Sequence, residues 1–201
     1  MNTDWASMTI ASIVEGDGEV TALPKLLHRI AGELGVSLRT PTPQRVPRGK
    51  LTVIGGIERW VSTAAPRVVG GGGVLVLIDA DDDCPAQLGP DLLSRARAAR
   101  DDKRITVVLA NREFEAWFLA AATSLAGQHG FPTDMHSHDK PEAPRDCKGW
   151  LTKQRPRGHP YKETVDQAPI ASTFDLKMAR ENSPSFDKFY RDVAWLLAAD
   201  Q

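Results

Sequence analysis

The sequence has few cysteines and no long hydrophobic run, and each absence excludes a class of protein. Two cysteines among 201 residues, Cys84 and Cys147, form no C-x-x-C or Cys/His pattern, so neither a disulfide framework nor structural zinc is expected. No apolar run approaches the roughly 20 residues of a membrane-spanning helix. Residues 1–8 contain Asp4 and lack a basic stretch, so we expect no secretory signal, no membrane partner and a cytoplasmic location.

The sequence also lacks an excess of charge of either sign, because the formal net charge at pH 7 is only -1. Global charge therefore gives no indication of a polyanionic partner, but the charges are unevenly distributed. Acidic residues concentrate at 15–19 and 79–83, whereas Lys and Arg outnumber Asp and Glu in residues 140–162. A protein that binds nucleic acid through a metal ion needs both kinds of region. An ordinary solvated loop of mixed charge explains the basic region equally well.

Short apolar runs alternate with amphipathic stretches in the first two-thirds of the chain. Strands are predicted at residues 8–14, 37–40, 74–78 and 105–110. Helices are predicted at residues 19–34, 51–65, 88–100 and 113–125. This alternation is typical of βαβ units. We therefore expect an α/β fold over residues 1–127, with a Rossmann-like, parallel four-stranded sheet flanked by helices.

The last third of the chain has a different character. Residues 128–168 are rich in Pro, Gly, His and charged residues without regular periodicity, which is typical of a functional or partner-ordered segment. Apolar periodicity returns at 183–199, and Ser183-Pro184 is a typical helix start. We expect residues 128–201 to form a basic irregular segment and a C-terminal helix packed on the core.

Acidic residues follow three of the predicted strands. Glu15 follows the first strand, Asp79 the third, and Glu113 and Glu115 come shortly after the fourth. Parallel α/β sheets place their sites at the carboxyl ends of the strands, so these carboxylates are expected to converge. A divalent cation is the simplest way to offset their repulsion, and such oxygen ligands select Mg²⁺ or Mn²⁺.

Spacing refines the expected role of some of these acids. Asp79 and Asp81 form a D-x-D pair, and in extended backbone both carboxylates, with Asp83 after them, face the same side. Glu19 lies in the first turn of a predicted helix, where a capping role explains it as well as metal binding does. Glycines beside Glu15 allow a sharp turn close to a ligand.

Glu113 and Glu115 are two residues apart at the start of a predicted helix. Their side chains are therefore about 200° apart around the helix axis. Only one of the two is expected to face the site.

The succession of these motifs resembles the Toprim domain, and most closely the Toprim nucleases of the overcoming-lysogenization-defect (OLD) type. Nearly the whole chain also resembles a bacterial Toprim-like family known as domain of unknown function 4276. The motifs that carry the resemblance are VEGDGE (14–19), LIDADDDCP (77–85), REFEAWFLA (112–120), YKETVDQ (161–167) and SPSF (183–186).

The resemblance implies roles for individual residues. Glu15 would act as a general acid/base or metal ligand, and Asp79 and Asp81 would bind Mg²⁺. Acids for a second ion correspond to Glu19 and Glu115, with Glu113 as a further candidate. A late lysine that steadies the transition-state phosphate corresponds to Lys162.

The resemblance also implies a partner. Proteins of this type are commonly encoded beside an ABC/OLD-like ATPase in bacterial anti-phage modules. This chain has no G-x-x-x-x-G-K-[ST] motif, so a separate subunit would supply ATP hydrolysis.

These observations predict a Mg²⁺- or Mn²⁺-dependent nuclease that cleaves phosphodiester bonds of DNA or RNA. The predicted catalytic residues are Glu15, Glu19, Asp79, Asp81, Glu115 and Lys162. The predicted metal ligands are Glu15, Glu19, Asp79, Asp81, Asp83, Glu113 and Glu115. The residues predicted to contact the nucleic-acid backbone are Lys148, Lys153, Arg155, Arg157 and Lys162.

Two other functions compete with this prediction. The chain could also form a homo-oligomer. The chain could instead be a partner-gated binding or regulatory subunit of an ATPase complex with little catalysis of its own. A phosphatase of the haloacid dehalogenase type is disfavoured, because its D-x-D follows the first strand, whereas here Glu15 follows the first strand and D-x-D the third.

Overall fold

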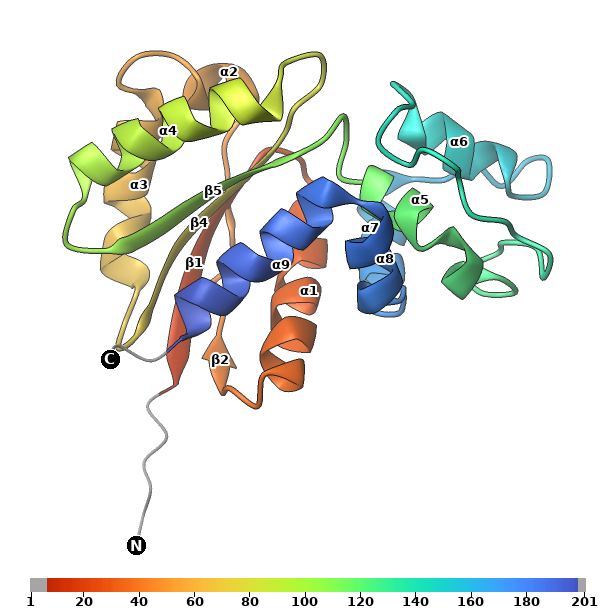
Figure 1. Ribbon diagram of the computed structural model, residues 1–201, viewed down its shortest axis with the longest axis horizontal. Coiled ribbons are helices and arrows are strands. Elements are labelled where there is room, and N and C mark those ends of the chain that lie inside the picture. Colours follow the sequence, from red (N-terminus) through yellow and green to blue (C-terminus); the bar gives the residue numbers. More distant parts are fainter. Residues whose placement is uncertain (1–6, 199–201) are drawn as a thin grey trace, which may run out of the picture.

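A parallel β-sheet between two layers of helices forms the centre of the molecule in this computed structural model, which describes residues 7–198 (Figure 1). The strands are β1 (Met8–Val14), β2 (Leu38–Arg39), β3 (Gln44–Arg45), β4 (Gly72–Asp79) and β5 (Arg104–Ala110). Their order is β2-β1-β4-β5, with β3 also paired to β1, and these pairings are all parallel. The α/β class with a helix-flanked parallel sheet is confirmed and is consistent with a Rossmann-like fold.

The sheet has five strands, not the four expected, because two short strands share the edge beside β1. β2 pairs with the beginning of β1 (Met8↔Leu38), whereas β3 pairs with its end (Val14↔Arg45). The stretch between them contains Pro41 and Pro43. Proline has no N–H to donate to a strand ladder, so the edge is interrupted there.

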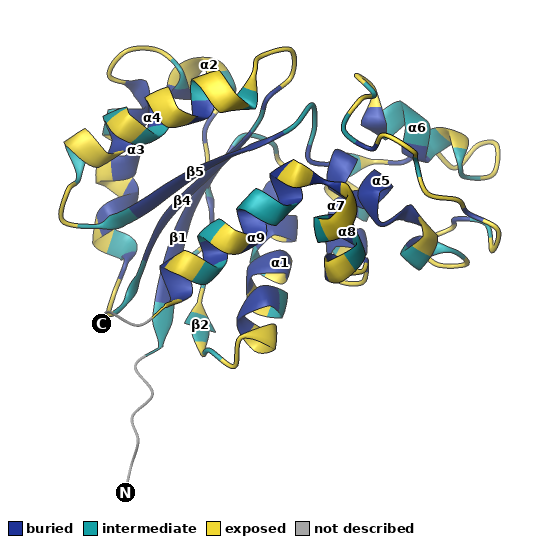
Figure 2. Cartoon of the chain, viewed as in Figure 1, coloured by how far each residue is buried: buried dark blue, intermediate teal, exposed yellow. Residues whose placement is uncertain are grey.

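Two layers of helices cover the two faces of the sheet. Helices α1 (Glu19–Glu33) and α9 (Pro184–Leu197) lie on one face, and α3 (Gly56–Ala64) and α4 (Pro85–Ala99) lie on the other (Figure 1). Successive side chains of a strand point to opposite faces. Leu75 of β4 accordingly belongs to the first hydrophobic core and Val76 to the second. Figure 2 shows the strands buried between these layers.

The helix predicted at 51–65 is interrupted. A short helix, α2 (Arg48–Leu51), precedes α3, and Gly55 between them has a φ of 75°. Glycine adopts this left-handed conformation readily, and Gly55 is the residue from which α3 starts. A 3₁₀ turn, η1 (Ala65–Arg67), then leads toward β4.

Residues 116–182 form a helical lobe beside the sheet (Figure 1). Its elements are α5 (Ala116–Ala120), the 3₁₀ turn η2 (Ala122–Leu125), α6 (Cys147–Lys153), α7 (Glu163–Ala171) and α8 (Leu176–Asn182). The helix predicted at 113–125 is thus divided, and the segment predicted to be irregular contains α6 and the start of α7. Asp146 favours α6 because its side chain caps the helix by accepting a hydrogen bond from the Gly149 N–H (2.7 Å).

The lobe and α9 share an aromatic core. Trp117 stacks on Phe189 at a ring distance of 4.9 Å, and Phe118 packs edge-on against Phe174 at 5.3 Å. The predicted start of α9 is confirmed, since the Ser183 hydroxyl accepts a hydrogen bond from the Phe186 N–H (3.1 Å). The predicted end of this helix at residue 199 and the N-terminal residues 1–6 lie outside the described residues.

Within residues 7–198, no helix has both the length and the hydropathy that crossing a lipid bilayer requires.

Candidate carboxylate site

The strand order reverses beside β1, and acidic residues gather at that point. From β1 the chain continues to β2 on one side, and β4 pairs with β1 on the other. Val14 is paired with Leu77, so Glu15 leaves β1 beside the end of β4, where Asp79 lies. Asp79 is in turn paired with Ala110, the last residue of β5. Crevices at such switch points are where α/β proteins place their sites.

Glu19 is buried at the start of α1, and its carboxylate binds the loop that precedes the helix. Its Oε2 accepts hydrogen bonds from the backbone N–H groups of Glu15 (3.1 Å) and Gly16 (2.9 Å). Burial raises the pKa of Glu19 to about 7 despite the Gly16 hydrogen bond, and repulsion from Glu115 and Glu163 adds to the effect. Glu19 therefore does not cap α1 as a side-chain cap would, because the N–H groups that it binds belong to the loop before the helix.

Glu115 is fully buried and lies close enough to Glu19 and Asp79 to repel them electrostatically. Its Oε1 accepts hydrogen bonds from the Tyr161 hydroxyl (2.8 Å) and from Nε2 of Gln167 (3.2 Å). Its Oε2 is buried without a hydrogen-bond partner. Burial raises the pKa of Glu115 to about 7. An ionised Glu115 thus has an unsatisfied oxygen, which is costly in a protein interior.

Asp79 lies among these groups. Its Oδ1 accepts a hydrogen bond from the Phe114 N–H (2.8 Å). Burial, followed by repulsion from Glu19 and Glu115, raises the pKa of Asp79 well above its usual range. The pKa of Glu15 is also raised, first by burial and then by Asp81, and its Oε2 is buried without a hydrogen-bond partner. We name Glu15, Glu19, Asp79 and Glu115 the acidic cluster.

Lys148 of α6 supplies positive charge to the acidic cluster. Its Nζ lies 2.9 Å from Oε2 of Glu163 and 3.9 Å from Oε2 of Glu115. Burial lowers the pKa of Lys148, but the surrounding carboxylates of Glu115, Glu163 and Asp79 raise it above its ordinary value. The ammonium group is therefore charged and partly offsets the repulsion between the acids.

Lys162, the lysine expected in the site, is exposed at the start of α7. Its backbone N–H donates to Oδ2 of Asp166 (2.6 Å), and no hydrogen bond or ion pair joins its ammonium group to another of residues 7–198. The structure places Lys148 in the cluster instead. Sequence reasoning had assigned Lys148 only to the nucleic-acid backbone, because nothing in the local pattern indicates which way α6 faces.

Helix α7 packs directly on the glycine-containing loop after β1. Oε1 of Glu163 accepts a hydrogen bond from the Gly18 N–H (3.2 Å). A Cβ added at Gly18 would lie 2.3 Å from Oε1 of Gln167, and one at Gly16 would lie 2.8 Å from Oε1 of Glu163. The two glycines are thus required for close approach of α7. Glu163 and Gln167 both lie in the YKETVDQ motif, the one signal that could have linked them to the site.

Replacing Gly18 with alanine is therefore expected to destabilise the protein by about 1–3 kcal/mol, because the new methyl group overlaps Gln167 and Glu163. The backbone of Gly18 has a φ of -65°, which alanine tolerates. Any loss of stability therefore comes from the overlap and not from backbone strain. Urea unfolding measures the change. The matched control is Gly32→Ala in α1, where no atom lies within 4 Å, and a slight stabilisation is expected. Equal stability of Gly18→Ala and wild type would contradict the packing argument.

Three of the predicted metal ligands depart from the expected arrangement. Asp81 has a left-handed φ of 51°, so the backbone turns and the predicted alternation through Asp83 is wrong. Asp81 Oδ2 lies 3.8 Å from Nε of Arg48, and Asp83 forms an ion pair with the same guanidinium. Glu113 is occupied elsewhere, since its Oε2 accepts hydrogen bonds from the backbone N–H groups of Cys147 (3.0 Å) and Lys148 (3.3 Å).

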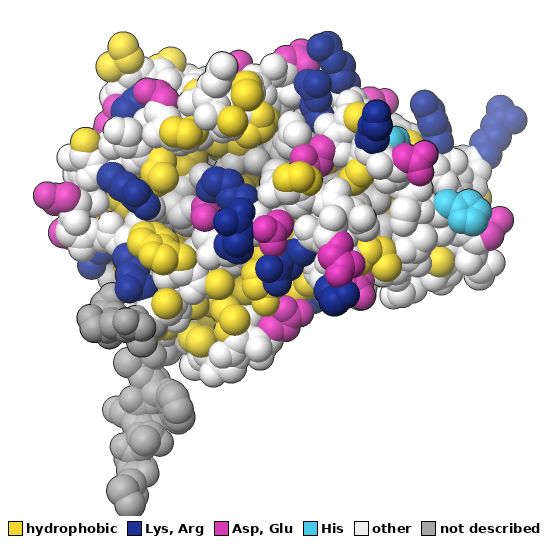
Figure 3. Space-filling view, in the orientation of Figure 1, with side chains coloured by type: hydrophobic (Ala, Val, Ile, Leu, Met, Phe, Trp, Pro, Cys, Tyr) yellow, Lys and Arg dark blue, Asp and Glu magenta, His cyan; other side chains and the backbone are white. Residues whose placement is uncertain are grey.

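Among the basic residues predicted to contact nucleic acid, Arg155 is not available to bind a phosphate, because it is buried and paired with an acid. Only 6% of its side chain is exposed, and both Nη atoms contact the Asp166 carboxylate (2.9 and 3.0 Å). Its guanidinium also lies over the Phe131 ring at 4.8 Å. Lys153 and Arg157 are exposed. Figure 3 shows Lys and Arg side chains projecting from the part of the lobe that carries α6.

Two arginines outside that set lie beside the acidic loop that follows β4. Nη1 of Arg112 (2.9 Å) and Nη2 of Arg145 (3.0 Å) both contact Oδ1 of Asp82. Together with Asp81 and Glu113 they line a hollow of about 240 Å³. Sequence reasoning missed Arg112 because its motif was interpreted through its glutamates alone.

The acidic cluster meets the chemical requirements of a hard divalent cation, but it is not a preformed coordination shell. Within residues 7–198, no group of three or more His, Cys, Asp or Glu side chains is arranged to bind a metal ion. Two buried oxygens, Oε2 of Glu15 and Oε2 of Glu115, nevertheless have no hydrogen-bond partner. Carboxylate oxygens of this kind suit Mg²⁺ or Mn²⁺, and a doubly charged ion would offset the mutual repulsion.

The fold and this site together define a class: a Rossmann-like α/β protein with an acidic cluster at the carboxyl ends of its parallel strands. The family described as Domain of unknown function (DUF4276) matches residues 14–194. Because the match covers most of the chain, the protein belongs to this family. Comparisons with curated proteins and with solved structures found no match.

Proposed function

We propose that the protein is a Mg²⁺- or Mn²⁺-dependent, Toprim-like nuclease, related to the OLD type, that cleaves phosphodiester bonds of nucleic acid. The observation that carries the proposal is the gathering of Glu15 and Asp79, at the ends of β1 and β4, with Glu115 at the start of α5. One buried oxygen of Glu15 and one of Glu115 lack hydrogen-bond partners. These residues, with Asp81 beside them, would hold the ion. A bound divalent ion supplies activation of water and stabilisation of negative charge on the departing oxygen.

The chain's own groups would position the substrate and move protons. The OLD resemblance gives Glu15 a role as general acid/base or metal ligand, and its place after the end of β1, beside Asp79, suits either role. Lys148 carries a charged ammonium beside the cluster, so we assign to it the phosphate-steadying role that the OLD resemblance had placed on Lys162. Arg112 and Arg145 at the rim suit a neighbouring phosphate, with Asp82 as their present partner.

Purified protein tests this proposal on three substrates: supercoiled plasmid DNA, single-stranded DNA and transfer RNA. Cleavage is expected with Mg²⁺ or Mn²⁺ and none with EDTA, because the carboxylates have no catalytic use without the ion. Mn²⁺ binding by calorimetry gives a readout that does not depend on choosing the right substrate. Absence of both cleavage and Mn²⁺ binding would contradict the proposal.

The position of Lys148 also supports a restrained form of this nuclease within a bacterial anti-phage module. Its ammonium lies beside the oxygens that an ion would use, so a partner that moved α6 would free them. We propose an ABC/OLD-like ATPase subunit as that partner. Co-expression with an ABC/OLD-like ATPase is expected to yield a complex with cleavage raised about tenfold or more. A monodisperse protein whose elution and cleavage are unaffected by that ATPase would exclude this partner.

A further inference from the structure

A hollow of about 450 Å³ opens at the β2 edge of the sheet, and the acidic cluster does not contribute to it. Its walls come from the beginning of β1, from α1, from β2 and from η1. Thr9 lines the hollow, whereas Glu15 lies six residues further along the same strand direction. At a rise of about 3.3 Å per residue, the two places are roughly 20 Å apart.

Three basic side chains line this hollow: His28, Arg39 and Arg67. No Asp or Glu of residues 7–198 is among the lining residues. Nη2 of Arg67 donates to the backbone oxygen of Thr42 (2.6 Å), and Nδ1 of His28 lies 2.7 Å from the oxygen of Pro24. Neither contact supplies a negative charge, so the guanidinium of Arg67 has no counter-ion there.

Arg39 is the least engaged of the three. It is exposed on β2, and no ion pair, hydrogen bond or ring contact joins its guanidinium to another described residue. Thr9 and Thr40 add polar groups to the same walls, and the Thr9 hydroxyl donates to the oxygen of Val69 (2.7 Å). Two arginines brought to one concave site without a carboxylate repel each other, and an anion would offset that repulsion.

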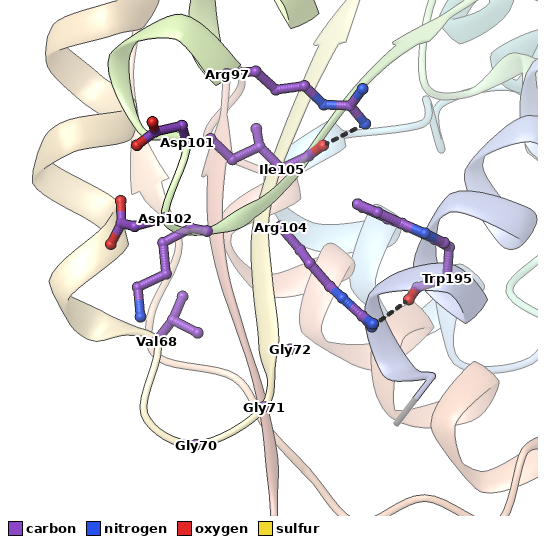
Figure 4. A pocket seen from close by; sticks show the side chains of 11 residues that line it. Val68, Gly70, Gly71, Gly72, Arg97, Asp101, Asp102, Arg104, Ile105 and Trp195 are labelled. Atoms are coloured by element: carbon purple, nitrogen blue, oxygen red, sulfur yellow. Dashed lines mark hydrogen bonds between the residues drawn. The ribbon is translucent and has the colours of Figure 1, made fainter. Parts of the chain in front are cut away.

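A second cavity shows that a lining of basic residues without acids is not a general property of the surface. It has a volume of about 600 Å³ and lies where β4 and β5 begin (Figure 4). Arg97 and Arg104 line it, with their guanidinium groups over the Trp195 ring at 5.7 and 5.4 Å. Asp101 and Asp102 line the same cavity, so its lining contains acids as well as basic groups. The hollow at the β2 edge lacks such acids.

We propose that the hollow at the β2 edge binds a phosphate group. Guanidinium groups form paired, charge-assisted hydrogen bonds to phosphate, and Arg39 and Arg67 provide two of them. Nε2 of His28 and the Thr40 hydroxyl add further polar contacts. The volume of about 450 Å³ falls within the range of small-molecule sites, so the phosphate can belong to a larger ligand. This site goes beyond the proposed nuclease function and does not depend on it.

Calorimetry with inorganic pyrophosphate in the presence of EDTA tests the site without a metal ion at the acidic cluster. Wild-type protein is expected to bind pyrophosphate, and Arg39→Gln to bind it about tenfold more weakly, because one charge-assisted contact is lost. The Arg39 side chain has no partner among residues 7–198, so this variant is expected to fold normally. The double variant Arg39→Gln/Arg67→Gln is expected to abolish binding. The control is Lys177→Gln, which removes an 84%-exposed positive charge in α8.

A short single-stranded DNA, titrated in EDTA and followed by fluorescence anisotropy, identifies the source of the phosphate. If Arg39→Gln weakens DNA binding about tenfold relative to Lys177→Gln, the hollow takes a phosphate of the nucleic-acid backbone. If it weakens only pyrophosphate binding, the ligand is a free phosphorylated compound. The proposal is overturned if Arg39→Gln and Lys177→Gln have equal affinity for both probes, or if wild-type protein binds neither. Loss of nuclease activity has no bearing on these outcomes.

Discussion

Replacing Asp79 with asparagine is expected to lower the rate of metal-dependent cleavage by about a thousandfold or more, because the change removes a negative charge from the centre of the acidic cluster. Asparagine keeps an oxygen that can accept the hydrogen bond from the Phe114 N–H, so the turn after β4 is preserved. Glu15→Gln is expected to show a loss of similar size. The measurement is the initial rate of plasmid nicking with Mg²⁺ at neutral pH.

The matched control for both variants is Asp91→Asn. Asp91 lies on α4 with 61% of its side chain exposed, and its partner is Arg95 at 3.5 Å. The same carboxylate-to-amide change there is expected to leave the rate unchanged. Thermal unfolding of each variant separates a lost function from a lost fold. Wild-type rates in both Asp79→Asn and Glu15→Gln would place the active site elsewhere in the chain.

Metal-free protein is expected to lose stability as the pH rises from about 4.5 to about 7. Glu19 and Glu115 have an ordinary pKa of 4.5, which burial raises to about 7 in the folded protein. The folded state therefore binds these protons more tightly than the unfolded chain. Their stabilising contribution is complete below pH 4.5 and is lost as the pH passes through 7. Each group accounts for up to roughly 3 kcal/mol, and Asp79 acts in the same direction.

One neighbour acts in the opposite direction. Burial raises the pKa of Glu163, but the hydrogen bond and charge of Lys148, the Gly18 N–H and the charge of Arg45 together outweigh it, so the pKa of Glu163 lies below its usual value. Its contribution to stability is lost when the pH falls, and it is present in full above pH 4.5. Burial lowers the pKa of His129, which also adds stability as the pH rises through this range. A net decline between pH 5 and pH 8 therefore reports the buried acids of the cluster.

Urea unfolding in EDTA at pH 5 and pH 8 measures this difference. Glu19→Gln is expected to reduce it, since a glutamine oxygen can still accept from the N–H groups of Glu15 and Gly16 without carrying a charge. Glu181→Gln, at an exposed position of α8, is the control and is expected to leave the difference unchanged. Adding Mg²⁺ at pH 8 is expected to restore stability, because an ion bound only by the folded state stabilises it. A stability that rises from pH 5 to pH 8 in EDTA would contradict the argument.

The local pattern predicted the central strands because burial on both faces requires continuous apolar runs. The runs at 8–14, 74–78 and 105–110 all lie within strands β1, β4 and β5. The pattern was less informative where a single residue changes the backbone. Gly55 interrupts a predicted helix, and the left-handed conformation of Asp81 ends the expected alternation of acids. Neither conformation follows from hydrophobic periodicity.

The sequence by itself determined that acids follow the ends of separate strands, and parallel pairing then brings Glu15 beside Asp79. The tertiary structure alone decided which basic groups join them. Lys148 lies beside the cluster, whereas Arg155 is committed to Asp166 and Lys162 is exposed. The physical reason is that the position of a long charged side chain depends on how its helix packs. The packing of α6 and α7 rests on contacts between residues far apart in the chain, such as Glu115 with Tyr161 and Gly18 with Glu163.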